Sequence, residues 1–282
     1  MTAALSPAGA RVPRAVWLTL AGIVAAVNMN AAYIIGSVQL HGLAIAASNL
    51  FGLNAAMLFA LYGLWEIGQK DTGNAAAAAV SRSDMVVIAA ALGLSLIPWN
   101  AASLVALLGM ALWCIFTGAP ETAERRAGLI MLAMGGSILI ARLLLNSVGD
   151  RVVNLDAQFV GWLAGVAVED NVVDFRNFGA RSFIIGLGCS SVHNMSQAVL
   201  LWATATQLLR LKIDAPLVLF ALLAMAGMFL VNAARLTTIV WYPQHFDTIH
   251  QGWIAELFGL ISLIVAALII AAGALHAHRR QA

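Results

Sequence analysis

Long apolar stretches without charged side chains are the feature that most limits what this chain can fold into. Residues 215–234 and 257–278 contain no Asp, Glu, Lys or Arg, and a helix needs about 20 apolar residues to cross the hydrocarbon core of a bilayer. Hydrophobic residues make up 62% of the chain and charged residues 10%, whereas a soluble domain is about 25% charged. The mean hydropathy of +0.90 agrees. The sequence therefore predicts an all-α, polytopic membrane protein.

Eight candidate spans divide the chain. We expect a bundle of about eight transmembrane helices that forms a single integral-membrane domain over residues 1–282. The first span is not preceded by a small-residue cleavage site, so we expect it to remain in the mature protein. The third is short, and we interpret it with the fourth as a tight hairpin. The candidate spans are residues 16–38, 42–65, 84–97, 100–117, 127–148, 190–209, 215–241 and 254–276.

The Lys and Arg residues predict how the chain sits in the membrane, because cytoplasmic loops carry an excess of them. If eight spans are correct, ten of the 15 basic residues fall on one side. The opposite short connections, residues 39–41, 98–99 and 242–253, carry none. We therefore expect a multi-pass protein of the inner (cytoplasmic) membrane with both termini in the cytoplasm. The ten residues are Arg11, Arg14, Lys70, Arg82, Arg125, Arg126, Arg210, Lys212, Arg279 and Arg280.

Charge and cysteine content narrow the function classes. The net charge is only +2 and no basic stripe exists to match phosphates, so a nucleic-acid partner is excluded. Two cysteines cannot build a disulfide framework or a zinc site. We expect no metal and no other cofactor, and membrane lipids as partners.

The long segment at residues 149–189 is expected to be external. Residues 156–168 have helical apolar spacing and predict a helix in the membrane interface. The β-leaning runs Val172–Phe175 and Phe183–Leu187, on either side of Gly179, predict a short β-hairpin that leads to Cys189. The segment is either an ordinary external loop or a cover over a site.

Three chemically useful side chains are predicted to meet at the external face. Cys189 lies at the outer end of the sixth span, Arg235 about two turns from the outer end of the seventh, and His250 before the eighth. A thiol near a helix N-terminus and a guanidinium is favoured as thiolate, and a histidine can carry its proton. These groups are what thiol-based acyl transfer needs. Cys114, deep in the fourth span, is interpreted as an inert apolar residue.

Each of these residues also has a simpler interpretation. Arg235 could reach toward the interface or pair with Asp247 or Glu256. His250 could be a surface residue of its loop. His193 follows Cys189 by four residues and would share its face of a helix, so it is a rival base.

The segments Cys189-Ser190-Ser191, Asn232-Ala233-Ala234-Arg235 and His250-Gln251-Gly252 together resemble the exosortase/archaeosortase family. The resemblance covers mainly residues 130–270 and implies an eight-span membrane cysteine protease and transpeptidase. It implies that Cys189 is the nucleophile, that His250 is the acid and base, and that Arg235 orients or stabilises the acyl intermediate. Ser190, Ser191, His193 and Asn232 would line or support the site.

Position 191 departs from the family pattern. The family commonly has Cys-Ser-Gly, and Ser191 stands here in place of the Gly. Glycine permits backbone conformations that serine resists. We therefore expect the turn at the nucleophile, and with it the substrate specificity, to differ.

The resemblance also implies a substrate. Such an enzyme cleaves the C-terminal signal of secreted proteins, which consists of a short motif such as Pro-Glu-Pro, a transmembrane helix and a basic tail. Cleavage at the external face would be followed by transfer of the acyl group to an acceptor. The implied partners are these secreted proteins and an exopolysaccharide assembly system.

Two other classes remain open. A secondary transporter would need a polar site near the midplane and usually paired repeats; Asn28, Asn30, Asn54 and Arg142 are candidate groups, but we find no repeat. A catalytically silent scaffold for exopolysaccharide or secretion assembly would keep the fold without needing Cys189.

Overall fold

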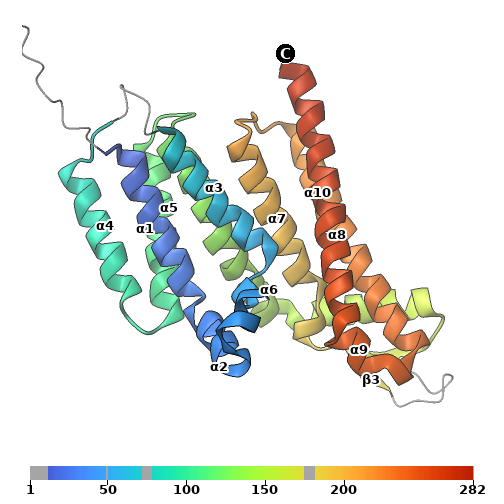
Figure 1. The fold of residues 1–282 in the computed structure, drawn as a ribbon. Helices are drawn as coiled ribbons and strands as arrows, with labels where there is room; N and C mark the ends of the chain where they lie inside the picture. Colours follow the sequence, from blue (N-terminus) through green and yellow to red (C-terminus); the bar gives the residue numbers. More distant parts are fainter. Residues whose placement is uncertain (1–11, 49, 72–77, 175–181, 282) are drawn as a thin grey trace, which may run out of the picture. The chain divides into compact units, whose positions relative to one another are not determined.

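The computed structural model of the chain describes residues 12–48, 50–71, 78–174 and 182–281. These residues are almost entirely helical (Figure 1). The helices are α1 Arg14–Met29, α2 Ala31–Ser48, α3 Ala55–Asp71, α4 Arg82–Ser95, α5 Asn100–Thr117, α6 Ala123–Ala164, α7 Ser191–Leu208, α8 Ala215–Trp241, α9 Phe246–His250 and α10 Trp253–Gln281. Short 3-10 turns lie at Leu50–Gly52, Leu187–Cys189 and Pro243–His245.

Several of these helices suit a membrane. Among the described residues, α5, α6, α8 and α10 are each long and apolar enough to cross a bilayer. A fifth span is obtained if α1 and α2, which are bent by 53° relative to one another, count as one. These helices support the predicted all-α membrane protein. They do not confirm eight spans, because α4 has 14 residues and α7, although it has 18, falls short in hydropathy.

The first two predicted spans have the wrong boundaries. We expected continuous helices at 16–38 and 42–65, but the chain turns at Asn30 and again between α2 and α3. The Asn30 side chain donates to the Ala26 carbonyl, and Asn54 accepts a hydrogen bond from the backbone of Met57 at 2.8 Å, at the start of α3. Asn side chains compete in this way for backbone groups and favour helix ends. Hydropathy alone does not register such ends.

Contacts divide the chain into two compact units. The first comprises residues 1–53 and 61–132, and the second residues 54–60 and 133–282. All the candidate site residues fall in the second unit.

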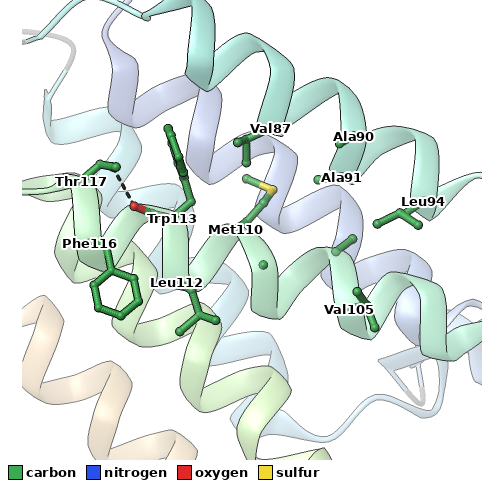
Figure 2. Close-up of a pocket in the computed structure, with 12 residues that line it drawn as sticks. Val87, Ala90, Ala91, Leu94, Val105, Met110, Leu112, Trp113, Phe116 and Thr117 are labelled. Atoms are coloured by element: carbon green, nitrogen blue, oxygen red, sulfur yellow. Dashed lines mark hydrogen bonds between the residues drawn. The ribbon is translucent and has the colours of Figure 1, made fainter.

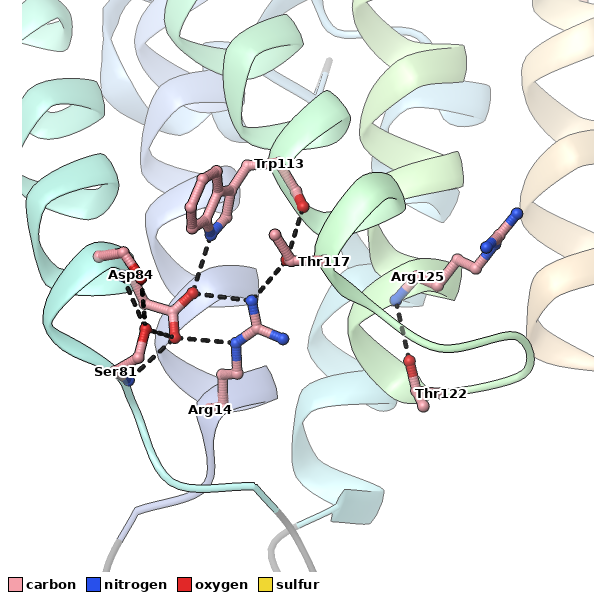
Figure 3. Close-up of polar contacts among 8 residues, drawn as sticks. Arg14, Ser81, Asp84, Trp113, Thr117, Thr122 and Arg125 are labelled. Atoms are coloured by element: carbon pink, nitrogen blue, oxygen red, sulfur yellow. Dashed lines mark hydrogen bonds and ion pairs between the residues drawn. The ribbon is translucent and has the colours of Figure 1, made fainter.

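In the first unit, α1, α4 and α5 pack against one another and are joined by a polar cluster at one end (Figure 3). Arg14 donates through Nε and Nη2 to the two carboxylate oxygens of Asp84, at 2.9 and 2.8 Å, and Nη2 also reaches Thr117 Oγ1 at 2.6 Å. Asp84 is completely buried, accepts from Trp113 Nε1 at 2.8 Å, and forms a capping box with Ser81. Every charge in the cluster is compensated, so the cluster stabilises the packing of three helices.

A cavity of about 570 Å³ lies between α4 and α5 (Figure 2). Its walls are almost wholly apolar, and the small residues Ala90, Ala91 and Gly109 leave it open. No charged or nucleophilic thiol side chain lines it. It therefore offers no catalytic chemistry.

In the second unit, α7, α8 and α10 lie side by side (Figure 1). Ala198, Ala224, Met228 and Ala266 are buried between them. The approach of α10 to α8 depends on Gly273, because an added Cβ there would lie 2.7 Å from the Phe220 side chain. Small residues allow close helix packing in membranes in this way.

Helix α6 bends at Val148, whose φ and ψ are −136° and 19°. Beyond the bend its last part crosses α8 near the end of α8 (Figure 1), where Val153, Ala157 and Val160 share a buried cluster with Leu236 and Ile239. The helix predicted at 156–168 corresponds to this last part. It ends earlier than predicted, at Ala164, because Gly165 adopts a φ of 71° that terminates the helix.

A three-stranded antiparallel sheet follows, formed by β1 Val168–Glu169, β2 Val172–Val173 and β3 Phe183–Ile184 in the order β1-β2-β3. The predicted hairpin is present as β2 and β3, with Val172 opposite Ile184 and Val173 opposite Phe183. Gly179, at its predicted tip, lies outside the described residues. Strand β3 leads within a few residues to the turn that carries Cys189.

Candidate active site

Cys189 is the last residue of a 3-10 turn that directly precedes α7. Ser190 is the N-cap of α7 and accepts a hydrogen bond from the Val192 backbone at 3.3 Å. The thiol therefore lies just outside the helix N-terminus. It packs against the buried cluster of α6, α8, α9 and the sheet.

The structure brings Cys189 and His250 into direct contact. Cys189 Sγ lies 3.2 Å from His250 Nε2, and both residues are half-buried. His250 is the last residue of the short helix α9. A sulfur and an imidazole at this distance can exchange a proton, which is the geometric requirement for an activated thiol nucleophile.

Aromatic packing sets the orientation of the His250 ring. The ring of Phe246 stacks on it, with centroids 5.0 Å apart and an interplanar angle of 18°, and Phe183 meets it edge-on at 6.3 Å. The other ring nitrogen, Nδ1, is buried and has no hydrogen-bond partner in the part of the chain that the structure describes. In Ser-His-Asp sites a carboxylate orients the histidine through that nitrogen. Here two phenylalanines fix the ring instead.

Helix α8 supplies two further side chains. Asn232 is buried and donates from Nδ2 to the backbone carbonyl of Cys189 at 3.0 Å. Arg235 follows it by nearly one turn on the same helix. Among the described residues, Arg235 Nε is buried without a hydrogen-bond partner. No ion pair with Asp247 or Glu256 is found where the structure describes the chain.

Four backbone N–H groups at the nucleophile are already used within the protein. In oxyanion holes, N–H groups near the nucleophile often stabilise the negative oxygen of the intermediate. The N–H groups of Cys189, Ser190, Ser191 and Val192 donate to Gly186 O (2.9 Å), Leu187 O (3.3 Å), Asp156 Oδ2 (3.0 Å) and Ser190 Oγ (3.3 Å), respectively. Arg235 Nε on α8, which has no hydrogen-bond partner among the described residues, is a candidate side-chain donor for an oxyanion.

Asp156 is a site residue that sequence reasoning missed. It is 5% exposed and accepts from both the backbone and the hydroxyl of Ser191, at 3.0 and 2.7 Å. The sequence predicts an interfacial helix around it and gives it no site role. The signal that could have identified it is its helical spacing from Val153 and Val160, which sets a carboxylate among apolar residues that face the core.

Ser191 fits its position without strain. It is the first residue of α7 and is not among the residues with positive φ. A glycine is therefore not required there. Its hydroxyl donates to Asp156 Oδ1 at 2.7 Å, a hydrogen bond that a glycine could not make.

His193 is exposed on the first turn of α7, and within the described residues its ring makes no contact with Cys189. The geometry thus favours His250 over His193 as the partner of the thiol. Both cysteines are free thiols, and Cys114 is fully buried against Gly128. Among the described residues, no three His, Cys, Asp or Glu side chains are grouped to hold a metal ion.

Comparisons with protein-family models, curated protein sequences and solved structures found no match.

Proposed function

We propose that the protein is a membrane-embedded cysteine protease or transpeptidase of the exosortase type. It cleaves the C-terminal sorting signal of secreted proteins at the external face of the inner membrane. The observation that carries this proposal is the 3.2 Å contact between Cys189 Sγ and His250 Nε2. Arg235 supports it, because its Nε is buried without a hydrogen-bond partner among the described residues and lies on α8, the helix whose Asn232 donates to the Cys189 carbonyl.

These side chains can carry out both halves of acyl transfer. His250 Nε2 takes the thiol proton, and the sulfur of Cys189 attacks the scissile carbonyl carbon. Arg235 stabilises the resulting oxyanion. When the carbon–nitrogen bond breaks, His250 returns the proton to the leaving amine and a thioester remains on Cys189. His250 then deprotonates an acceptor amine or water, which attacks the thioester and releases the thiol.

The orientation of the site is also part of the proposal. In the second unit, the start of α7, the end of α8 and α9 lie at one end, and the C-terminus lies at the other (Figure 1). The last turn of α10 carries Arg279 and Arg280, and Arg280 pairs with Asp214 at 3.3 Å. Because basic residues favour the cytoplasmic side, this arrangement supports a site on the external side. Eight spans with both termini in the cytoplasm fit it.

Three of the four polar residues that suggested the transporter alternative give it no support. Asn28 donates to Ser95 O and to Ser103 Oγ, Asn30 bonds within its own helix, and Asn54 caps α3. These amides have structural partners and do not form an open midplane site. A silent scaffold would keep this fold too, and only an assay of Cys189 separates it from an enzyme.

Trapping the acyl-enzyme tests the proposal. The full chain is co-expressed with a secreted reporter that ends in a Pro-Glu-Pro motif, an apolar helix and a basic tail. Mass spectrometry should then find a reporter acyl group in thioester linkage to Cys189. The reporter should be cut by the unaltered chain and by Cys114→Ala, but not by Cys189→Ala. Normal cleavage of the reporter by Cys189→Ala would contradict the proposal.

A further inference from the structure

We propose that Asp156 is a positioning residue for Cys189. Its carboxylate fixes the turn that carries the thiol, so that the thiol stays within reach of His250. The inference rests on the proposed roles of Cys189 and His250. It concerns a residue that neither the motifs nor the acyl-transfer chemistry includes.

Both carboxylate oxygens of Asp156 accept hydrogen bonds from Ser191, the first residue of α7. Oδ2 accepts the backbone N–H of Ser191 at 3.0 Å, and Oδ1 accepts its hydroxyl at 2.7 Å, although 35 residues separate the two in sequence. Both residues are at least 95% buried. Hydrogen bonds to a carboxylate are stronger than neutral ones, and a negative charge at a helix N-terminus is favourable. The contact is therefore a firm anchor.

The hydrogen bonds between Asp156 and Ser191 affect the position of Cys189, because Ser191 follows Cys189 by only two residues. On one side, Ser191 is held by the last part of α6. On the other, the Cys189 carbonyl is held by Asn232 of α8 at 3.0 Å. With both anchors in place the turn has one position, and that position sets the 3.2 Å approach of the thiol to His250. Without the α6 anchor, the turn keeps only its attachment to α8.

The chain offers variants that separate geometry from charge. Asp156→Ala removes both hydrogen bonds. Asp156→Asn can rebuild both without the charge, because its amide oxygen accepts the Ser191 N–H and its amide nitrogen donates to the hydroxyl oxygen. Ser191→Ala removes one of the two. A positioning role predicts that Asp156→Asn behaves like the unaltered chain and Asp156→Ala does not.

The test measures how strongly His250 controls the thiol, without any substrate. In the full-length Cys114→Ala background, the alkylation rate of Cys189 by iodoacetamide is measured with and without His250→Ala. In the Cys114→Ala background, we expect His250→Ala to lower the alkylation rate of Cys189 about tenfold. The same factor is expected when Asp156→Asn is also present. When Asp156→Ala is present, His250→Ala should lower the rate less than about twofold, because coupled neighbours are not additive in a double-mutant cycle. An unchanged tenfold factor in Asp156→Ala would overturn the inference. So would the lack of any effect of His250→Ala in the starting background.

Protein abundance and reporter cleavage distinguish a folding defect of Asp156→Ala from a failure of the proposed function. If Asp156→Ala does not accumulate, Ser191→Ala decides, and a full tenfold factor in that variant would also overturn the inference. The reporter assay supplies the second comparison: Asp156→Ala should lower kcat and leave KM unchanged, because Asp156 lies behind the turn. If Cys189→Ala still cleaves the reporter while the alkylation pattern holds, the proposed function fails and the positioning role stands.

Discussion

The thiol of Cys189 and the imidazole of His250 lie 3.2 Å apart across 61 residues of sequence. No secondary-structure element joins them directly. They meet because the turn before α7 and the short helix α9 pack on the same buried cluster, to which Leu236 and Ile239 of α8 contribute. If this contact is catalytic, substitution of each neighbouring residue should change reporter cleavage in a specific way.

Substitution of the nucleophile should abolish activity without loss of protein. We expect Cys189→Ala to lower reporter cleavage at least about a thousandfold, as for other covalent nucleophiles, with unchanged abundance in the membrane. Cys114→Ala is the matched control. Its thiol is fully buried and has no polar partner among the described residues, so cleavage should stay within about twofold, well below the effect of losing a nucleophile.

The two histidines should differ sharply. His250→Ala removes the group that takes the thiol proton, and we expect cleavage to fall by a factor of about 10² to 10⁴. His193 is exposed, and among the described residues the hydrogen bond of the thiol goes to His250, so His193→Ala should change cleavage less than about threefold, below the range for a general base. Rates of reporter cleavage for both variants decide the matter, and a reversed order of severity would identify His193 as the base.

Arg235 should tolerate no replacement. Its Nε is buried without a hydrogen-bond partner among the residues that the structure describes, and a lysine lacks both that donor and the planar fork of a guanidinium. We expect Arg235→Lys to lower kcat about 10²-fold or more, as for loss of an oxyanion donor, with normal abundance. Asp247→Asn is the control, because Asp247 forms no ion pair with Arg235 in the described structure. Near-normal cleavage by Arg235→Lys would rule out the catalytic role.

The ring of Phe246 should matter through His250. Phe246→Leu removes the stacked ring, and because aromatic pairs contribute about 0.5–1.5 kcal/mol beyond buried area, we expect kcat to fall up to about tenfold. Phe246→Tyr keeps the ring and should stay close to the unaltered rate. Single-turnover cleavage of the reporter measures both. Equal rates for the Leu and Tyr variants would mean that stacking does not orient His250.

The polar cluster of the first unit should govern stability. Asp84→Ala leaves the Arg14 guanidinium and the Trp113 indole without their acceptor, and loss of one partner of a buried ion pair costs about 3–5 kcal/mol. Glu66→Gln is the control, since it breaks the more exposed pair with Lys70, where we expect less than about 1 kcal/mol. Unfolding in mixed detergent micelles, followed by circular dichroism, compares the two. Equal losses would contradict a structural role for the cluster.

The class of fold follows from the sequence because hydropathy is a local property. A run such as residues 215–234 has to be helical and buried in an apolar medium wherever it lies in the fold. The β-leaning runs around Gly179 predict the hairpin of β2 and β3 for a similar reason. The helix ends near Asn30 and Ser48 were not predicted, because single polar side chains and backbone dihedrals decide them.

For the candidate site too, local sequence predicted some features and the tertiary structure decided the others. The sequence by itself identified Cys189, Arg235 and His250 as side chains too polar or too reactive for their apolar surroundings. Only the tertiary structure decided that His250 and not His193 contacts the thiol, that Arg235 has no carboxylate partner among the described residues, and that Asp156 holds Ser191. These relationships join residues that are distant in sequence. They depend on the bend of α6 and the packing of α8 and α9, which bring the groups together and which no local pattern of residues specifies.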